Sequence, residues 1–141
     1  MNVNKMIKEK ETQFMNWWNS KYNEKIEMET FEKSNNDFFS ENYIIELKSR
    51  EDLYSTKMIE LYKLTSNYTK AQLSNKEFIY CVVDKGGVSI FNISKNIDDI
   101  LKLKIENRKM EHTKRFQSKK VINKIHYNLP ESLSAIWEQK I

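Results

Sequence analysis

The sequence predicts one α+β domain. At 141 residues and 17.0 kDa, the chain has the size at which single-core domains are most common. It is 39% hydrophobic and 12% aromatic, which is enough apolar surface for a core of its own. Some segments repeat apolar residues at helical spacing, while others alternate or run continuously as in strands. We therefore expect residues 1–141 to form a single domain.

The N-terminal half begins with a predicted helix at residues 4–28, because Phe14 and Trp18 recur there near helical spacing. We expect Trp17 and Trp18 to anchor the core. From Glu29 onward the pattern changes to short runs that are typical of strands. These runs lie at residues 31–34, 37–40 and 43–50.

A second helix is predicted at residues 55–72, where Ser55 or Thr56 would cap its start. The clearest hairpin follows: residues 78–83 and 88–93 are strand-like and flank a turn that contains two glycines. Cys81 lies in the middle of its apolar run. We expect it to be a small buried hydrophobic residue rather than a nucleophile.

In the C-terminal part we expect a short turn or helix at residues 96–100. Apolar residues that alternate with polar ones then predict paired strands at 101–106 and 121–129. The intervening residues 107–118 would form a basic loop. Pro130 would open a final helix that ends near residue 139. The predicted order is α-β-β-β-α-β-β-β-β-α.

Composition excludes several classes of protein. The sequence contains no apolar run long enough to cross a bilayer and no signal-peptide segment at its start. Its lone cysteine excludes an internal disulfide and a Cys-rich zinc site, which fits a reducing compartment. We therefore expect a cytoplasmic protein without a membrane partner, in the host cytoplasm if it is viral.

Positive charge is concentrated in one stretch. Residues 102–124 contain nine Lys or Arg and two Glu, which gives this stretch a charge of +7. Because the net charge of the whole chain is +4, the remaining residues together carry −3. Such a stretch favours a nucleic-acid partner, although basic segments are also common as solvated surface. The candidate contacts in the loop are Arg108, Lys109, Lys114 and Arg115.

A constellation that could perform chemistry appears if residues 41–42 form a two-residue turn. Antiparallel pairing then places Asp37 directly opposite Glu46, with Cβ atoms about 4.5–5.5 Å apart. Lys48 falls on the same face as Glu46, with Arg50 one pleat further on. Two carboxylates at this distance repel each other, so the pair requires a cation.

Magnesium, or manganese in its place, would suit this set of ligands. Mg²⁺ prefers hard oxygen ligands and retains several waters, so Asp37, Glu46 and the Leu47 carbonyl are a sufficient protein share. Lys48 beside the metal could orient or deprotonate a water for attack on a phosphodiester. The alternative is an ordinary exposed strand face with a salt bridge.

These residues resemble the PD-(D/E)xK nucleases, which have the restriction-endonuclease-like fold. Asp37 is followed after eight residues by Glu46-Leu-Lys48, and then by a predicted helix and two strands. Residues 43–50 and 56–63 are similar to segments of the small nucleases of phages and large DNA viruses. The resemblance implies an α-β-β-β-α-β core with a mixed central sheet, followed by a C-terminal hairpin and a short helix.

The resemblance also implies roles for individual residues. Asp37 and Glu46 would bind the metal, Lys48 would be the catalytic lysine, and Lys63 would face the scissile phosphate. Glu11 on the first helix is a possible additional acid. His112 and His126 are too far from other ligand residues to suggest zinc, so we expect them to be structural or on the surface.

The expected function is that of a magnesium-dependent endodeoxyribonuclease from a phage or virus, with DNA as its partner and a homodimer as a possible assembly. A non-catalytic nucleic-acid-binding protein on the same fold is the alternative. A structural or interaction protein with an α+β core is a third possibility, which predicts no salt-dependent affinity for nucleic acid.

Overall fold

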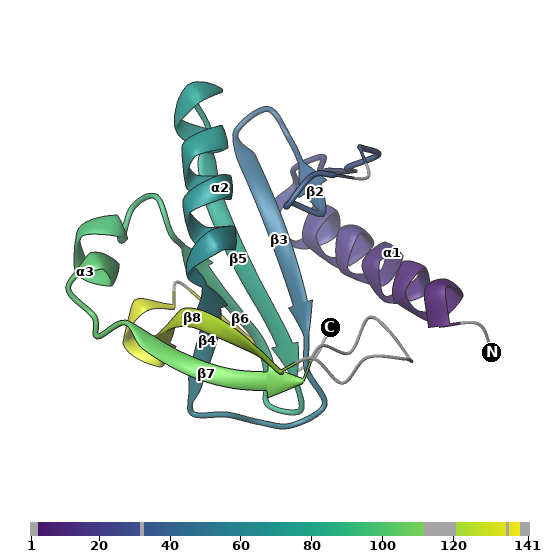
Figure 1. The fold of residues 1–141 in the computed structure, drawn as a ribbon. Helices are drawn as coiled ribbons and strands as arrows, with labels where there is room; N and C mark the ends of the chain where they lie inside the picture. The colour runs from purple at the N-terminus through teal and green to yellow at the C-terminus, as the bar shows by residue number, and fades with distance from the viewer. Residues whose placement is uncertain (1–2, 32, 112–120, 135, 139–141) are drawn as a thin grey trace.

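The computed structural model describes residues 3–31, 33–111, 121–134 and 136–138, and it has a mixed α+β architecture (Figure 1). The helices are α1 (Val3–Tyr22), α2 (Leu61–Leu73) and α3 (Ile97–Leu101), with a 3-10 turn, η1, at Glu131–Leu133. The strands are β1 (Glu27–Met28), β2 (Phe38–Phe39), β3 (Tyr43–Ser49), β4 (Thr56–Glu60), β5 (Glu77–Asp84), β6 (Gly87–Asn92), β7 (Glu106–Glu111), β8 (Val121–Pro130) and β9 (Ile136–Glu138).

The strands form two sheets. The larger has six strands in the order β1-β2-β3-β5-β6-β9, and the smaller has three in the order β4-β8-β7. In the larger sheet β3 and β5 are parallel, while the other pairs are antiparallel. A parallel pair requires a crossover, which here consists of β4 and α2. The expected mixed α+β class is therefore confirmed.

The first helix is shorter than predicted. It ends at Tyr22 because Asn23 adopts a left-handed conformation with φ of 47°, which asparagine tolerates better than most residues. The Asn19 side chain then bonds both the N–H and the carbonyl of Ile26, which holds the returning chain against the helix. Ile26 therefore reaches the core from a turn rather than from the helix. The strand predicted at 31–34 is absent from the described residues there, and β1 precedes that segment.

The hairpin of β2 and β3 has the predicted register. Phe38 pairs with Ile45, and Phe39 pairs with Ile44. Ser40 closes the turn, because its hydroxyl accepts the N–H groups of Asn42 and Tyr43. The predicted pairs of residue 38 with 45 and of residue 39 with 44 are thus confirmed, whereas Asp37 lies just before β2 and its N–H bonds to Ile45 rather than pairing with Glu46.

The predicted helix at 55–72 was wrong at its start, because residues 56–60 form β4 and α2 begins only at Leu61. In β4 the burial alternates: Lys57 and Ile59 are buried, whereas Thr56, Met58 and Glu60 are more exposed. This pattern has a period of two, and the strand is stabilised by pairing with β8, about seventy residues away in the sequence. The spacing of Met58 and Leu61 by itself fits a helix, but the pairing with β8 makes this segment a strand.

Three further differences lie in the C-terminal part. The strand predicted at 101–106 is the end of α3 and an extended connection, so that β7 begins only at Glu106. Residues 107–111 of the predicted basic loop therefore lie in β7, and 112–118 lie outside the described residues. The helix predicted from Pro130 to residue 139 is replaced by η1 and β9, which pairs with β6. The hairpin of β5 and β6 is confirmed.

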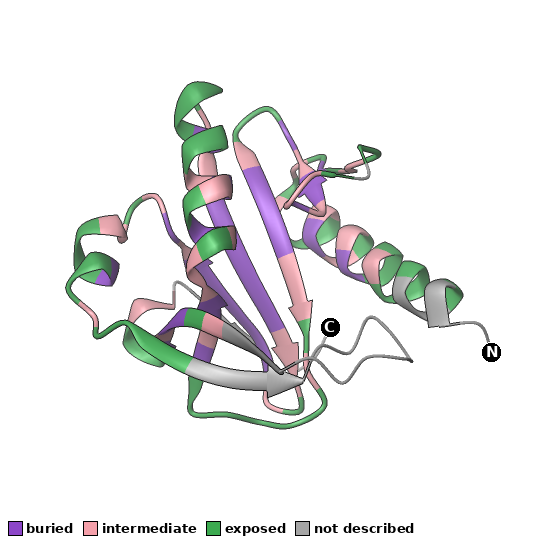
Figure 2. Cartoon of the chain, viewed as in Figure 1, coloured by how far each residue is buried: buried purple, intermediate pink, exposed green. Residues whose placement is uncertain are grey.

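The central sheet is covered on both faces. Residues of β5 alternate between two core clusters: Phe78, Tyr80 and Val82 pack with α2, and Ile79 and Cys81 pack with α1. This double burial explains the continuous apolar run of β5, and Figure 2 shows buried residues concentrated in β3 and β5. Trp18 and Cys81 are both buried, as expected, and burial raises the pKa of the Cys81 thiol. In the described part of the chain no helix is long and apolar enough to span a membrane.

A buried ion pair connects the two sheets. Lys57 Nζ on β4 lies 2.6 Å from Asp84 Oδ2 at the end of β5, and both side chains are fully buried. The same ammonium donates to the Tyr54 carbonyl, and Asp84 Oδ1 accepts the Gly86 N–H. Because charges without partners are very unfavourable in a protein interior, each of these groups depends on the other.

We expect Asp84→Asn to lower the free energy of unfolding by about 3–5 kcal/mol, because it leaves the Lys57 charge buried with weaker compensation. Chemical denaturation of both proteins measures the difference. Glu29→Gln is the control, because Glu29 lies 4.0 Å from Lys70 in a pair that is partly open to solvent, with side chains 18% and 44% exposed, and solvated pairs contribute at most about 1 kcal/mol. Equal losses in the two variants would contradict this role for the Lys57–Asp84 pair.

Candidate functional site

Asp37 and Glu46 lie side by side where β2 meets β3. The Asp37 N–H donates to the carbonyl of Ile45 at 2.9 Å, the residue that also pairs with Phe38. The Asp37 carboxylate in turn accepts the Leu47 N–H at 2.8 Å. Asp37 is therefore fixed to β3 by its backbone and by its side chain. Glu46 belongs to the middle of β3 and is only 2% exposed.

Helix α2 holds the Glu46 carboxylate from its other side. Lys63 Nζ lies 2.8 Å from Oε1, and Asn67 Nδ2 lies 3.2 Å from Oε2. Asn67 is itself 1% exposed and also donates to the Asn35 carbonyl at 3.0 Å. The structure thus brings together Asp37, Glu46 and Lys63, which are far apart in the sequence.

The Leu47 carbonyl belongs to the same strand edge as Asp37. In a β-strand the N–H and C=O of one residue point toward the same neighbouring strand, and the Leu47 N–H points to the Asp37 carboxylate. Because β2 begins only at Phe38, it does not run alongside Leu47 at this edge of β3. The Leu47 carbonyl therefore faces the same edge of β3 as the Asp37 carboxylate.

Burial makes the negative charge of this group unfavourable. It is the main cause of the raised pKa of Asp37, which the Leu47 N–H and the charges of Lys63 and Lys48 oppose. Burial likewise raises the pKa of Glu46 despite the ion pair with Lys63, and the Asp37 charge adds to this effect. For Glu11 on α1, burial and then the Asp37 charge raise the pKa. Glu11 is therefore within electrostatic reach of Asp37.

The oxygen atoms of this group suit a divalent cation such as magnesium, although the number of carboxylates is small. Two carboxylates and a carbonyl are all-oxygen ligands, and a carboxylate has about four lone-pair sites, so Glu46 can retain Lys63 and Asn67 while it binds a cation. A bound cation would also relieve the unfavourable charge that raises the acids' pKa values. Among the described residues, however, no group of three or more His, Cys, Asp or Glu side chains could hold a metal ion. Glu11 is therefore not a third carboxylate ligand in this arrangement.

The two lysines of the site have opposite pKa shifts. Burial lowers the pKa of Lys48, and the charges of Arg50, Lys63 and Lys124 lower it further. Burial acts in the same direction on Lys63, but the charge and hydrogen bond of Glu46 outweigh it and raise the pKa. Lys48 therefore releases its proton more easily than an ordinary lysine, whereas Lys63 remains charged. Such a divergence is typical of groups with different roles in one site.

The second sheet forms another wall of the site. Glu60 at the end of β4 pairs with Lys124 of β8 at 3.0 Å. Burial tends to raise the pKa of Glu60, but the hydrogen bond and charge of Lys124 outweigh it, so the pKa is lowered. Glu60 and Met58 share a small pocket with Glu46, Lys48 and Lys63. The basic stretch thus reaches the site through Lys124.

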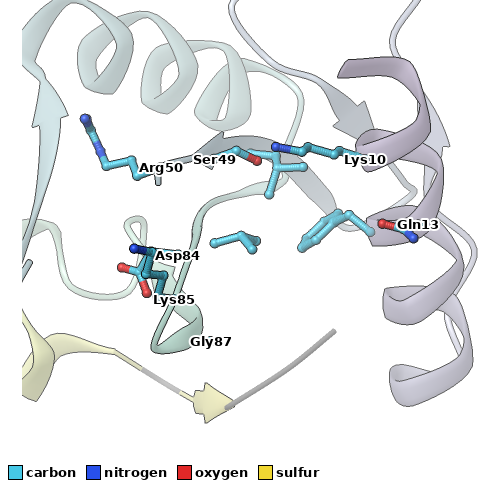
Figure 3. A pocket seen from close by; sticks show the side chains of 10 residues that line it. Lys10, Gln13, Ser49, Arg50, Asp84, Lys85 and Gly87 are labelled. Carbon is cyan, nitrogen blue, oxygen red and sulfur yellow. The ribbon is translucent and has the colours of Figure 1, made fainter. Parts of the chain in front are cut away.

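Arg50 lies where several hollows of the surface meet. It lines the small pocket with Lys48 and also a cavity of about 410 Å³ between α1, the end of β3 and the turn of β5 and β6. Figure 3 shows Lys10 and Gln13 on the α1 side of this cavity, and the Arg50 guanidinium pointing away from Asp84 and Lys85. Leu47 lines the same cavity from the α1 side of the sheet.

Sequence reasoning missed two residues of the site, Asn67 and Lys124. Asn67 could have been found, because it lies four residues after Lys63 and therefore on the same face of the helix. Lys124 could not, because its contact depends on the pairing of β4 with β8. The side chains of Arg108 and Lys109, and the whole of His112, Lys114 and Arg115, lie outside the described residues. His126 is buried, and its Nδ1 lies 2.9 Å from the Lys124 carbonyl.

No protein-family model matches the chain, and a search of curated proteins finds no match. The geometry of the site is therefore the basis for any assignment of function.

We expect Asp37→Asn to leave the metal-free protein as stable at pH 7 as the parent, or slightly more stable. A raised pKa means that folding favours the protonated acid. The stabilising contribution of protonated Asp37 is complete below its unfolded-state pKa of about 4. It is lost as the pH rises through the pKa that Asp37 has in the folded state. The advantage of the variant should therefore shrink from pH 7 to pH 4, which thermal melts in EDTA can measure.

The same variant should lose the stabilisation that excess Mg²⁺ gives the parent at pH 7, because a ligand that binds only the folded state stabilises it. Asp52→Asn is the control, since Asp52 is an exposed acid in the loop between β3 and β4. A variant that is less stable than the parent in EDTA, yet equally stabilised by Mg²⁺, would contradict the metal site.

Proposed function

We propose that the protein is a metal-dependent nuclease that hydrolyses phosphodiester bonds of DNA. The observation that carries this proposal is the closeness of Asp37, just before β2, to Glu46 in β3, with Lys48 and Lys63 within electrostatic reach of both. Two buried carboxylates with raised pKa values, next to two lysines with opposite pKa shifts, destabilise the fold. Such groups are typical of sites that bind a cation and move a proton.

Asp37, Glu46 and the Leu47 carbonyl would hold Mg²⁺ or Mn²⁺. When bound, the ion would supply positive charge to the scissile phosphate and to the leaving oxygen. The protein's own residues would do the remainder. Asn67 and Lys63 orient the Glu46 carboxylate, and the Leu47 N–H orients that of Asp37.

Lys48 is the residue best suited to accept a proton from the attacking water. Its lowered pKa increases the fraction of neutral amine at neutral pH, and efficient general bases have pKa values near the working pH. Lys63 remains charged and would stabilise the additional negative charge that develops on the phosphate. Arg50, half-buried at the end of β3, would bind a neighbouring phosphate.

The arrangement of α1, β2, β3, α2 and β5 supports the proposal that the fold is of the restriction-endonuclease-like type. The insertion of β4 before α2 is a departure from the expected order, and it allows the second sheet to approach the site. The basic stretch that contains Lys124 supports a nucleic-acid substrate, since phosphates are neutralised by such residues. A phage or viral source and a homodimer remain proposals from the resemblance alone.

Binding without catalysis is the second candidate. It is favoured by the state of Glu46, because Lys63 and Asn67 each occupy one of its oxygens. In that case the ion pair of Glu46 and Lys63 would be structural, and Arg50, Lys124 and the other basic residues would bind nucleic acid alone. Divalent-dependent cleavage distinguishes the two candidates.

We expect Lys48→Ala to lower turnover by about 10²–10⁴-fold, the usual contribution of a positioned proton-transfer group, while Mg²⁺-dependent stabilisation persists. The parent's rate should rise with pH as Lys48 deprotonates through its lowered pKa. Cleavage of a panel of linear, nicked, branched and single-stranded DNA with Mg²⁺ or Mn²⁺ provides the measurement. Lys95→Ala, an exposed lysine after β6, is the control.

Unchanged cleavage by Lys48→Ala would remove Lys48 from the mechanism. No cleavage of any substrate by the parent, despite metal-dependent stabilisation and salt-dependent binding of DNA, would favour the candidate that binds without catalysis.

A further inference from the structure

A second cavity, of about 330 Å³, lies between the loop that follows β3 and one face of the smaller sheet. We call it the Tyr54 pocket. Its lining includes Arg50, Tyr54, Thr56, Asn107, His126 and Asn128. Its volume is in the range of pockets that hold small ligands. None of these residues except Arg50 belongs to the candidate catalytic site.

The register of the smaller sheet explains why these side chains converge. Met58 pairs with Asn128, and His126 pairs with both Glu60 and Glu106. Cross-strand partners share a face, and the residues between them, such as Tyr127, turn to the core on the other face. The pocket therefore occupies the same face of the sheet as Glu60, which lines the small pocket with Lys48.

Arg50 connects the Tyr54 pocket to the candidate catalytic site. It lines the Tyr54 pocket, and it also lines the small pocket that contains Glu46, Lys48 and Lys63. Its charge is close enough to Lys48 to lower the pKa of that amine. A phosphate bound by Arg50 would thus be next to the scissile phosphate, with the attached nucleoside at the Tyr54 pocket.

The chemistry of the lining suits a planar, polar ligand. Tyr54 is 47% exposed, so its aromatic ring offers a surface for stacking. His126 is only 5% exposed although it lines the pocket, and its Nδ1 must donate to the Lys124 carbonyl at 2.9 Å. In the neutral ring the other nitrogen is then an acceptor. Asn107 and Thr56 add donors and acceptors, and Asn128 offers its carbonyl oxygen, because its amide nitrogen donates to Glu106, which also lines the pocket.

We propose that the Tyr54 pocket binds an unpaired nucleobase of the nucleic-acid strand that the site acts on. A base offers a face for the tyrosine ring, an edge for the amides and the imidazole, and a phosphate for Arg50. In a duplex the faces are stacked and the pairing edges are occupied, so the base must be extruded or already single. The inference rests on the proposed function, and it names the substrate class: nucleic acid with unpaired nucleotides.

The test is the binding of a labelled single-stranded oligonucleotide and of a blunt duplex of the same sequence, measured by fluorescence anisotropy in EDTA. We expect the parent to prefer the single strand. Tyr54→Ala should weaken single-strand binding roughly 5- to 150-fold, the range for loss of one stacked base, and should change duplex binding little. Tyr54→Phe should retain most of the affinity.

Two further variants make the result specific. Tyr54→Ile keeps apolar bulk but removes the ring, so its affinity for the single strand should fall as much as that of Tyr54→Ala. If thermal melts show that Tyr54→Ala is unstable, Tyr54→Ile is used in its place. Phe31→Ala removes an aromatic ring that is 66% exposed outside the pocket, and it should bind like the parent.

Equal single-strand affinity of the parent and Tyr54→Ala would overturn the inference, as would equal affinity of the parent for the duplex. Parallel cleavage assays with Mg²⁺ separate this failure from that of the proposed function. Cleavage that is insensitive to Tyr54 would overturn only the pocket. Single-strand binding that depends on Tyr54, without cleavage by the parent, would overturn only the nuclease.

Discussion

The attachment of Asp37 to β3 is the constraint on which the candidate site depends. One backbone bond and one side-chain bond, to Ile45 and Leu47, fix Asp37 immediately before β2 and hold its carboxylate at the edge of β3. A shift of one residue would turn Glu46 and Lys48 to the other face of the sheet and Ile45 and Leu47 out of the core. The packing of Ile45 with Phe38 and Phe14 therefore protects the geometry of the polar face.

Around this attachment the structure concentrates charge that burial opposes. Asp37 and Glu46 are shifted toward protonation and Lys48 toward deprotonation, while Lys63 is kept charged by Glu46. At the other end of β5, Lys57 and Asp84 form a fully buried ion pair, whereas the first cluster adds a second carboxylate, that of Asp37, to the ion pair of Glu46 and Lys63. The contrast between these two clusters is the main physical reason to assign chemistry to the first and stability to the second.

The smaller sheet gives the candidate site its surroundings. By pairing with β8, β4 presents Met58 and Glu60 to the site and Ile59 to the core. The same pairing brings Lys124 to Glu60 and creates the Tyr54 pocket. Arg50, between the two hollows, would let one strand of nucleic acid contact both. The position of this sheet thus connects the proposed chemistry with the proposed choice of substrate.

The sequence by itself determined the features that depend on near neighbours. The two-residue turn at 41–42 and the alternation of β3 predicted that Phe38 pairs with Ile45 and Phe39 with Ile44, and the two-glycine turn predicted the β5–β6 hairpin. The resemblance implied Lys63 as a site residue, but only the tertiary structure shows its contact with Glu46. The tertiary structure alone decided that residues 56–60 and 136–138 are strands, because their partners, β8 and β6, are distant in the sequence. A short amphipathic segment satisfies either a helical or a strand period, and the backbone partner that it finds during folding decides between them.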